Sequence, residues 1–372
     1  MTLRRWLRRL LPPASLAVGL VVIGVVACRS GQSPADLLRA LPAHAHLLAL
    51  GIMLADLGAR VGRWLLLAKG IGVPLRARTA VAAQLAGEAA GAMTPARLGA
   101  DPTKLMVAAR DARSVAGPGA LLVGEAFAEG VALTVLVTAL FFFAPRARGL
   151  PLLGVMGYAL FLVGVGTAVL MAARNRPGRE RPRWLKRLRL PRDRWRQFRV
   201  LVRHLRVRAG RLERLPVGRG AAVLAVTAVH IAARLAVLPV LALSAGATGP
   251  LLLLVLWPLF FFYVAILVPS PGGGGTVEVG FALALGGTVV GPSVAALLIW
   301  WRFYTFYLGA LIGGVVLAAL GAFGRRPAPR SGAADYGPSD AAAAGATAGS
   351  IARSGAVGAV ASRRSSHSRQ AE

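Results

Sequence analysis

The sequence predicts an all-α polytopic membrane protein, and its composition and patterning carry this prediction. Of the 372 residues, 56% are hydrophobic and only 16% are charged, whereas soluble domains have about 25% charged residues. The apolar residues form long blocks, several of them near the roughly 20 residues that a helix needs to cross a bilayer. The net charge of +30 lies mostly outside these blocks, where positive residues set membrane topology. No recognition motif accompanies this charge, so we expect no nucleic-acid partner.

Each apolar block is expected to form one helix. Long helices are predicted over residues 14–28, 45–68, 119–143, 150–173, 220–245, 250–268 and 294–323, and shorter ones over residues 79–93 and 276–290. These elements make residues 1–323 one transmembrane domain. Residues 324–372 are rich in Ala, Gly, Ser and Arg and are predicted to be disordered. The first block ends at Cys28, the only cysteine. A lipoprotein signal peptide has a similar outline, but the many later spans favour a first transmembrane helix.

The arginines predict the orientation of the helices. Four arginines among the first nine residues place the N-terminus in the cytoplasm, and the loop 174–219 carries 18 Arg or Lys, so it is expected on the same side. The intervening number of crossings is then even, which requires that segment 79–93 does not cross. Its 15 residues would reach about 22 Å, short of the ~30 Å hydrocarbon core, so it is expected to enter and return or to lie at depth. Segment 276–290 is equally short. The basic start of the tail favours a crossing there, and about eight transmembrane helices in total.

The basic loop has a further possible role at the membrane surface. Residues 194–214 interleave Arg with Trp, Phe, Val and Leu, which indicates an amphipathic helix lying on anionic lipid. A solvated loop that only sets the topology is the alternative.

Two short segments are broken by proline and glycine. They read MTPARLGADPTK at residues 93–104 and PSPGGGGTVEVG at residues 269–280. Each occupies a comparable place in its half of the chain, which predicts a two-halves arrangement and a transporter-like binding site. A broken helix exposes backbone groups that must be buried in protein or line a wet cavity, and a helix start there favours anions such as phosphate. A pair of ordinary interfacial loops is the alternative.

Charged side chains inside the predicted spans are the second functional signal. A charge at the bilayer centre costs about 2.5–3.5 kcal/mol, so such residues usually pair or line a polar path. Several stand four residues apart and share a helix face. The predicted intramembrane charge network comprises Asp56, Arg60, Arg63, Glu88, Glu125, Glu129, Arg234 and Arg302.

Each of these charges also has a plainer interpretation. Arg60 and Arg63 would snorkel to the interface beside Trp64, Glu125 would lie among the headgroups, and His230 would be a packed core histidine. His44 and His46 alone do not make a metal site. The chain contains none of the common nucleophile, metal or nucleotide motifs, so we expect no metal, no cofactor and no enzymatic activity. An intramembrane enzyme acting on lipid-linked substrates is the least favoured alternative.

Four stretches of the sequence resemble a known family. They are GRWLLL at residues 62–67, TPARLGADP at 94–102, EAFAE at 125–129 and PSPGGGGTVE at 269–278. They are similar to motifs of the flippase-like transmembrane region of lysylphosphatidylglycerol synthetases, and the last is the most specific. The resemblance extends over about residues 45–320. Ala126 stands where the family usually has Arg, which leaves the local partner of Glu125 open.

The resemblance implies a lipid flippase or transporter of the bacterial cytoplasmic membrane, with anionic membrane lipids as ligands. The aminoacyl-transferase domain of the synthetases is not expected among the roughly 49 low-complexity residues after Phe323, so lysyl transfer is not the expected activity. A non-transporting accessory protein that organises a lipid or glycan synthesis enzyme is the alternative, and a homo-oligomer is a further expected assembly. The residues expected to bind the lipid headgroup are Pro95, Arg97, Gly99, Asp101, Lys104, Pro271, Gly272, Gly273, Gly275 and Glu278.

Overall fold

The computed structural model describes residues 33–112, 114–144, 149–174, 210–264, 275–286 and 294–323, with residues 24, 25, 28, 31, 207 and 208. The chain divides into two compact units, Met1–Leu320 and Gly321–Glu372, and the contacts below lie in the first. The described elements are α2 (Pro34–Arg39), α3 (Ala43–Ile71), α4 (Ala77–Ala92), α5 (Ala100–Ala112), α6 (Ala116–Phe143), α7 (Leu150–Arg174), α10 (Val217–Ser244), α11 (Leu251–Tyr263), α12 (Thr276–Leu285), α13 (Val294–Arg302), the π-helical turn η3 (Phe303–Tyr307) and α14 (Leu308–Phe323).

Five helical stretches in the described ranges are long and apolar enough to cross a membrane. They are Ala43–Ile71, Ala116–Phe143, Pro151–Met171, Val217–Ser244 and Val294–Gly321. They confirm an all-α polytopic membrane protein, because these ranges contain no β-strand. They do not confirm the expected count of about eight crossings. Most of the expected helix 14–28, most of the basic loop and the tail after residue 323 lie outside the described residues.

The helix expected over residues 250–268 is shorter in the structure. It ends at Tyr263 after 13 residues, which span about 20 Å at 1.5 Å per residue and are too few to cross a ~30 Å core unaided. Pro258 lies inside it and removes one backbone donor. The following helix is shorter still, because α12 has 10 residues and ends at Leu285. The second half of the chain therefore holds two short helices in succession.

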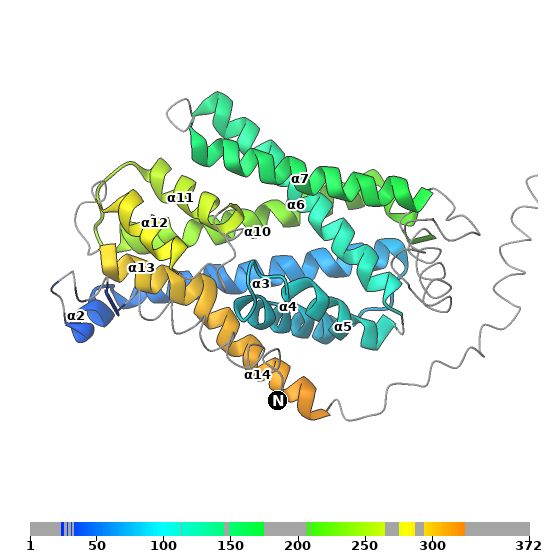
Figure 1. Ribbon diagram of the computed structural model, residues 1–372, viewed down its shortest axis with the longest axis horizontal. Coiled ribbons are helices and arrows are strands. Elements are labelled where there is room, and N and C mark those ends of the chain that lie inside the picture. Colours follow the sequence, from blue (N-terminus) through cyan, green and yellow to red (C-terminus); the bar gives the residue numbers. More distant parts are fainter. Residues whose placement is uncertain are drawn as a thin grey trace, which may run out of the picture. The chain divides into compact units, whose positions relative to one another are not determined.

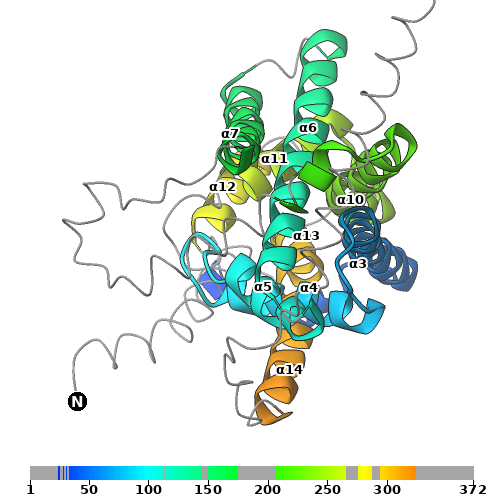
Figure 2. The ribbon, with the colours of Figure 1, turned by 90° about the vertical axis from the view of Figure 1, so that its right-hand side faces the viewer.

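The first half also holds two short helices, and they form a hairpin. α4 and α5 pack against each other in opposite directions. Near the open end, the backbone N–H of Arg76 donates to Asp111 Oδ2 at 3.0 Å. Near the turn, a Cβ added at Gly91 would lie 3.3 Å from the Cβ of Ala100. Figure 2 shows the two helices side by side. The short segment expected at residues 79–93 is thus the first arm of a hairpin, and α5 is the second.

The long helices α3 and α10 make the most extensive packing in the described part of the chain and lie side by side in Figures 1 and 2. They run in opposite directions. Gly70 near the end of α3 approaches Arg219 near the start of α10, and Gly62 approaches Val226. Asp56, nearer the start of α3, bonds to His230. These two helices form a central frame, and the two pairs of short helices, α4 with α5 and α11 with α12, pack at its ends.

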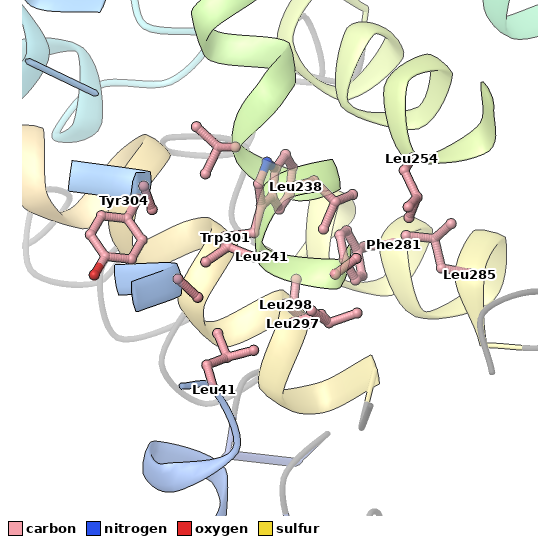
Figure 3. Packing of buried hydrophobic residues seen from close by; sticks show 14 of the residues in the cluster. Leu41, Leu238, Leu241, Leu254, Phe281, Leu285, Leu297, Leu298, Trp301 and Tyr304 are labelled. Atoms are coloured by element: carbon pink, nitrogen blue, oxygen red, sulfur yellow. The ribbon is translucent and has the colours of Figure 1, made fainter. Parts of the chain in front are cut away.

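Two apolar cores lie at opposite ends of this α3–α10 frame. One packs the end of α3, including Trp64 and Leu67, against α4, α5 and α6. The other packs the start of α3 and the end of α10 against α11, α12 and α13, and Figure 3 shows its central side chains, among them Leu238, Phe281 and Trp301. The rings of Phe281 and Trp301 stack with centroids 5.2 Å apart. A third core joins α6, α7, α10 and α11.

Candidate functional site: a buried charge cluster around a cavity

The turn of the α4–α5 hairpin places Arg97. Ala96 and Arg97 have positive φ angles of 49° and 55°, an uncommon conformation for residues with a Cβ that tends to occur at functional sites. The turn is held by Thr94, whose hydroxyl donates to the carbonyl of Ala90 at 2.8 Å and accepts from the N–H of Gly99 at 2.8 Å. A Cβ at Gly99 would lie 2.8 Å from that same carbonyl, so glycine is required. Pro95 lies in this turn beside them.

Arg97 joins the first of two buried charge groups. Its guanidinium pairs with Glu88, which also pairs with Arg60 and, at 3.2 Å, with Arg234. The guanidinium of Arg60 continues to Asp56 at 3.1 Å. Asp56 is fully buried, and it accepts from Arg234 at 3.5 Å and bonds to His230. The group therefore links α3, α4, α10 and the hairpin turn.

The second group is built on Glu125. Its carboxylate pairs with Arg63 and with Lys104 Nζ at 3.4 Å, and it accepts from Trp64 Nε1 at 2.7 Å. Arg63 also contacts Glu129 at 3.4 Å. Glu125 thus has three donors although Ala126 replaces the arginine usual in the family. Lys104 further approaches Asp101 at 3.7 Å.

Both charge groups line one cavity of about 260 Å³. Five basic side chains face it, together with four carboxylates and His230. The charged lining residues are Arg60, Arg63, Arg97, Lys104, Arg234, Glu88, Asp101, Glu125 and Glu129. Asp56 lies behind them as a fifth carboxylate. Charges of the two signs therefore balance, and each buried charge has a partner, as burial requires.

The structure decides between the alternatives left open for four residues. Arg63 is 1% exposed at its side chain, so it does not snorkel, and Arg60 is buried as well. Glu125 is buried among cations instead of lying among headgroups. His230 is buried, yet it bonds to Asp56 and lines the cavity, so it is not a purely apolar core histidine.

Sequence reasoning missed the aromatic part of the site. Trp64 donates to Glu125, and Tyr158, Phe262 and Tyr263 line the cavity. The ring of Phe262 lies 5.6 Å from the guanidinium carbon of Arg234, within the range of a cation–π contact. Aromatic residues in an apolar span carry no signal of their own. Trp64 belongs to the GRWLLL stretch at residues 62–67, but that stretch did not indicate a contact between its indole and Glu125.

Two further predicted residues form a separate buried pair in the second half. Arg302 Nε donates to Glu278 Oε1 at 2.7 Å, and Glu278 Oε2 accepts from the N–H of Gly275 at 2.7 Å. Gly275 begins α12 with φ 83°. Arg302 also lies over the ring of Phe306 at 4.5 Å. A cavity of only about 20 Å³ lies between this pair and Arg97. Pro271, Gly272 and Gly273 lie outside the described residues.

The site offers no obvious metal centre. Within the described ranges, no three His, Cys, Asp or Glu side chains are grouped as metal ligands. His46 instead bonds to the hydroxyl of Tyr304 at 3.0 Å.

Fold and site together define a class, namely a polytopic α-helical membrane protein with a charged cavity inside the protein. The family model of the lysylphosphatidylglycerol synthase TM region matches residues 14–313. The chain belongs to this family, as the motifs at residues 94–102 and 269–278 indicated. No curated protein matches the chain.

Proposed function

We propose that this protein binds the headgroup of a phosphate-bearing membrane lipid in its charged cavity and moves the lipid across the bacterial cytoplasmic membrane. The observation that supports this most is the cavity itself, with five basic and four acidic side chains inside a set of apolar helices. Charges in such a place are costly and mark the path of a polar substrate or ion. Membership of a lipid-related family supports a lipid as the ligand.

Arg97 and Lys104 are the proposed phosphate ligands. Their side chains are 20% and 13% exposed, more than those of Arg60 and Arg63. Arg234 is also 13% exposed, but it contacts both Asp56 and Glu88. A phosphate would displace Glu88 from Arg97 or Glu125 from Lys104, and each carboxylate keeps an arginine partner when it is displaced. The charge-assisted bond to phosphate thus replaces one ion pair with another, so that neither the bound phosphate nor the displaced carboxylate is left without a cationic partner. No covalent chemistry is needed for this role.

We further propose that the ends of α3 and α10 that meet near residues 70 and 219 face the cytoplasm. Basic residues gather there, and Arg208 and Arg211 donate to the carbonyl oxygen of Ile71 at 3.0 and 3.3 Å. The opposite ends, in residues 33–46 and 240–250, carry Arg39 and no other Lys or Arg. This asymmetry fits the positive-inside rule. It makes α4–α5 a hairpin that enters from the cytoplasm and returns, and α11 with α12 a second re-entrant pair entering from outside.

Lipid movement by the purified protein in liposomes tests the proposal. The vesicles carry a trace of a headgroup-labelled lipid, either anionic, zwitterionic or phosphate-free, and a membrane-impermeant quencher reports which leaflet holds it. We expect movement of the phosphate-bearing lipids and none of the phosphate-free lipid. Arg97→Ala and Glu278→Gln should slow movement at least about tenfold, the effect of losing ~1.4 kcal/mol of binding or barrier stabilisation.

Arg110→Ala is the matched control, because Arg110 lies in the same hairpin and is exposed away from the cavity. Its lipid movement should equal that of the unaltered protein. Unchanged movement in Arg97→Ala would remove Arg97 from the site, and unchanged movement in Glu278→Gln would show that the separate Glu278–Arg302 pair is not needed for movement. Absence of lipid movement altogether, with a lipid-synthesis enzyme recovered alongside the protein from membranes, would favour the accessory role.

A further inference from the structure

The two halves of the chain follow the same order of elements. α3, α4, α5 and α6 are long, short, short and long, and the same order recurs in α10, α11, α12 and the continuous run from α13 to α14. A shift of 174 residues moves Ala43 to Val217 and Ala77 to Leu251, which are the first residues of α10 and α11. Two consecutive helices therefore begin in the same register, without a gap between them.

The helix ends agree in this register. Pro42 precedes α3 and Pro216 precedes α10 as the capping residue. A glycine with positive φ follows each helix: Gly72 (φ 68°) is the C-cap of α3, and Gly246 (φ 75°) follows the C-cap Ala245 of α10. The same backbone bond closes each end: Val73 donates to Ala68 and Ala247 donates to Ala242, both at 2.9 Å. This is the 6→1 bond of a Schellman motif. Similar lengths of 29 and 28 residues, a capping proline and the same closing bond are the marks of a repeated structural unit.

The two apolar cores at the ends of the α3–α10 frame are built from equivalent positions. Trp64, Leu67 and Ala68 of the first core correspond to Leu238, Leu241 and Ala242 of the second, and Val107 corresponds to Phe281. The spacing from Phe281 to Leu297 is three residues longer than that from Val107 to Ala120, so the shift becomes 177 residues, and Ala120 and Leu121 correspond to Leu297 and Leu298. Figure 3 displays the second of these cores.

Contacts between the halves show how the repeats are related. Asp56 and His230 occupy equivalent positions in the register and bond to each other, which equivalent residues do where a two-fold axis passes between them. Arg60 and Arg234 are likewise equivalent, and both contact Asp56. α3 and α10 are antiparallel and span the membrane, so the axis lies in the membrane plane. The two halves are therefore inverted repeats.

The same register relates the open cavity to the closed pair in the second half. Lys104 corresponds to Glu278 and, with the longer connection, Glu125 corresponds to Arg302. The ion pair Lys104–Glu125 thus recurs as Glu278–Arg302 with its charges reversed. The nitrogen–oxygen distance is 3.4 Å in the first pair, which lines the cavity of about 260 Å³. It is 2.7 Å in the second pair, whose Arg302 lines a cavity of only about 20 Å³. Phe262 and Phe306, which line the small cavity, stand where the first half has Glu88 and Glu129.

We infer that Glu278 and Arg302 form a second headgroup half-site, which is closed in this conformation and opens to the opposite membrane face when the cavity at Lys104–Glu125 closes. The inverted relation of the repeats makes the two half-sites face opposite leaflets, whichever leaflet the open one faces. The assignment of a lipid headgroup to the second half-site rests on the proposed function; the alternation between the half-sites does not.

Cysteine labelling from the two sides of the membrane tests this inference. In a Cys28→Ala background, Ala126→Cys reports on the open cavity and Val277→Cys on the closed pocket. A membrane-impermeant maleimide should reach the two positions from opposite sides of oriented vesicles. Arg302→Gln removes the charge that holds the second half-site shut. It should therefore speed labelling of Val277→Cys and slow labelling of Ala126→Cys, each at least about threefold, because the two conformations share one equilibrium.

Two further variants complete the experiment. Arg302→Lys keeps the charge and should leave both labelling rates near those of the parent. Lys104→Gln should act oppositely to Arg302→Gln, since it weakens the pair that holds the first half-site closed. Labelling from one side only, or rates that rise together in Arg302→Gln, would overturn the inference. Labelling does not require that the protein moves any lipid. Reciprocal labelling without lipid movement would therefore discard the proposed function alone, and lipid movement without reciprocal labelling would discard the alternation alone.

Discussion

Glu88 is the residue on which the charge cluster depends most. Its carboxylate is shared by Arg60, Arg97 and Arg234, which come from α3, the hairpin turn and α10. Removing one partner from a buried ionic group leaves the others uncompensated, and this costs more than the intact group contributes. The stability of this group of ion pairs thus depends on one carboxylate.

Glu88→Gln should lower the free energy of unfolding by about 3–5 kcal/mol, because three guanidinium groups lose their common counter-charge. Asp101→Asn is the matched control: its side chain is 70% exposed against 9% for Glu88, so its effect should stay within about 0.5 kcal/mol. Unfolding in mixed detergent micelles measures both variants. Equal stability of the two would mean that Glu88 is not the centre of the cluster.

At the scale of residues, the sequence predicted the charged residues of the site better than the aromatic residues around them. Asp56, Arg60 and Glu125 stand out because charges are rare in apolar spans, and all three proved to be buried and paired. Trp64 and Tyr263 did not stand out, since an aromatic ring in a span is equally suited to an ordinary core. Their polar atoms acquire a role only through the fold, which brings α6 and α11 against the same cavity.

At the scale of elements, the helices α14 and α4 come into close contact at a glycine of α14. A Cβ added at Gly313 would lie 2.0 Å from the backbone carbonyl oxygen of Leu85, and Gly309, one turn earlier, faces Glu88. The two glycines form a G-x-x-x-G spacing, which lets membrane helices come into backbone contact. This approach fixes the helix that carries Glu88 against the last span.

Gly313→Ala should destabilise the protein by about 1–3 kcal/mol, as overpacking does in a close-packed interior. The adjacent Gly314 is an internal control, because nothing lies within 4 Å of a Cβ placed there. Gly314→Ala should be neutral or stabilising by up to ~1 kcal/mol, the difference in helix propensity. Thermal unfolding of the two variants in one detergent gives the comparison. The reverse order would contradict the close approach.

Helix starts were easier to predict than helix ends. The start expected at residue 276 is that of α12, and the start expected at residue 294 is that of α13. The end of α11 at Tyr263 was not predicted, because the apolar run continues to Val268 with no polar residue or glycine. Composition alone could not distinguish a spanning helix from a short one that stops where its neighbours do.

For the whole molecule, an inverted relation of the halves has a topological consequence. The connection after α3 and the corresponding connection after α10 must lie on opposite sides of the membrane. In a Cys28→Ala background, Lys69→Cys should react with an impermeant maleimide only from the cytoplasmic side. Thr248→Cys should react only from the outside. Both positions are exposed. Labelling of both from one side would exclude the proposed orientation.

The sequence predicted the membrane class and a two-halves arrangement from the matching Pro/Gly breaks. It did not reveal the register of 174 residues. Asp56 corresponds to His230 and Lys104 to Glu278, so charge and chemistry change at the positions that matter most. What the halves share is mainly caps, lengths and core positions, and these become visible only in three dimensions.

The balance of charges around the cavity also bears on energetics. Five carboxylates, with Asp56 counted, face five cations, and Glu278 with Arg302 adds one of each. A conformational change that carries this neutral set through the membrane field moves no net gating charge. Each elementary charge that does move is worth roughly 2.3 kcal/mol per 100 mV. If the protein moves lipid as proposed, any voltage dependence of that movement would therefore report the charge of the lipid headgroup together with that of any ion moving with it.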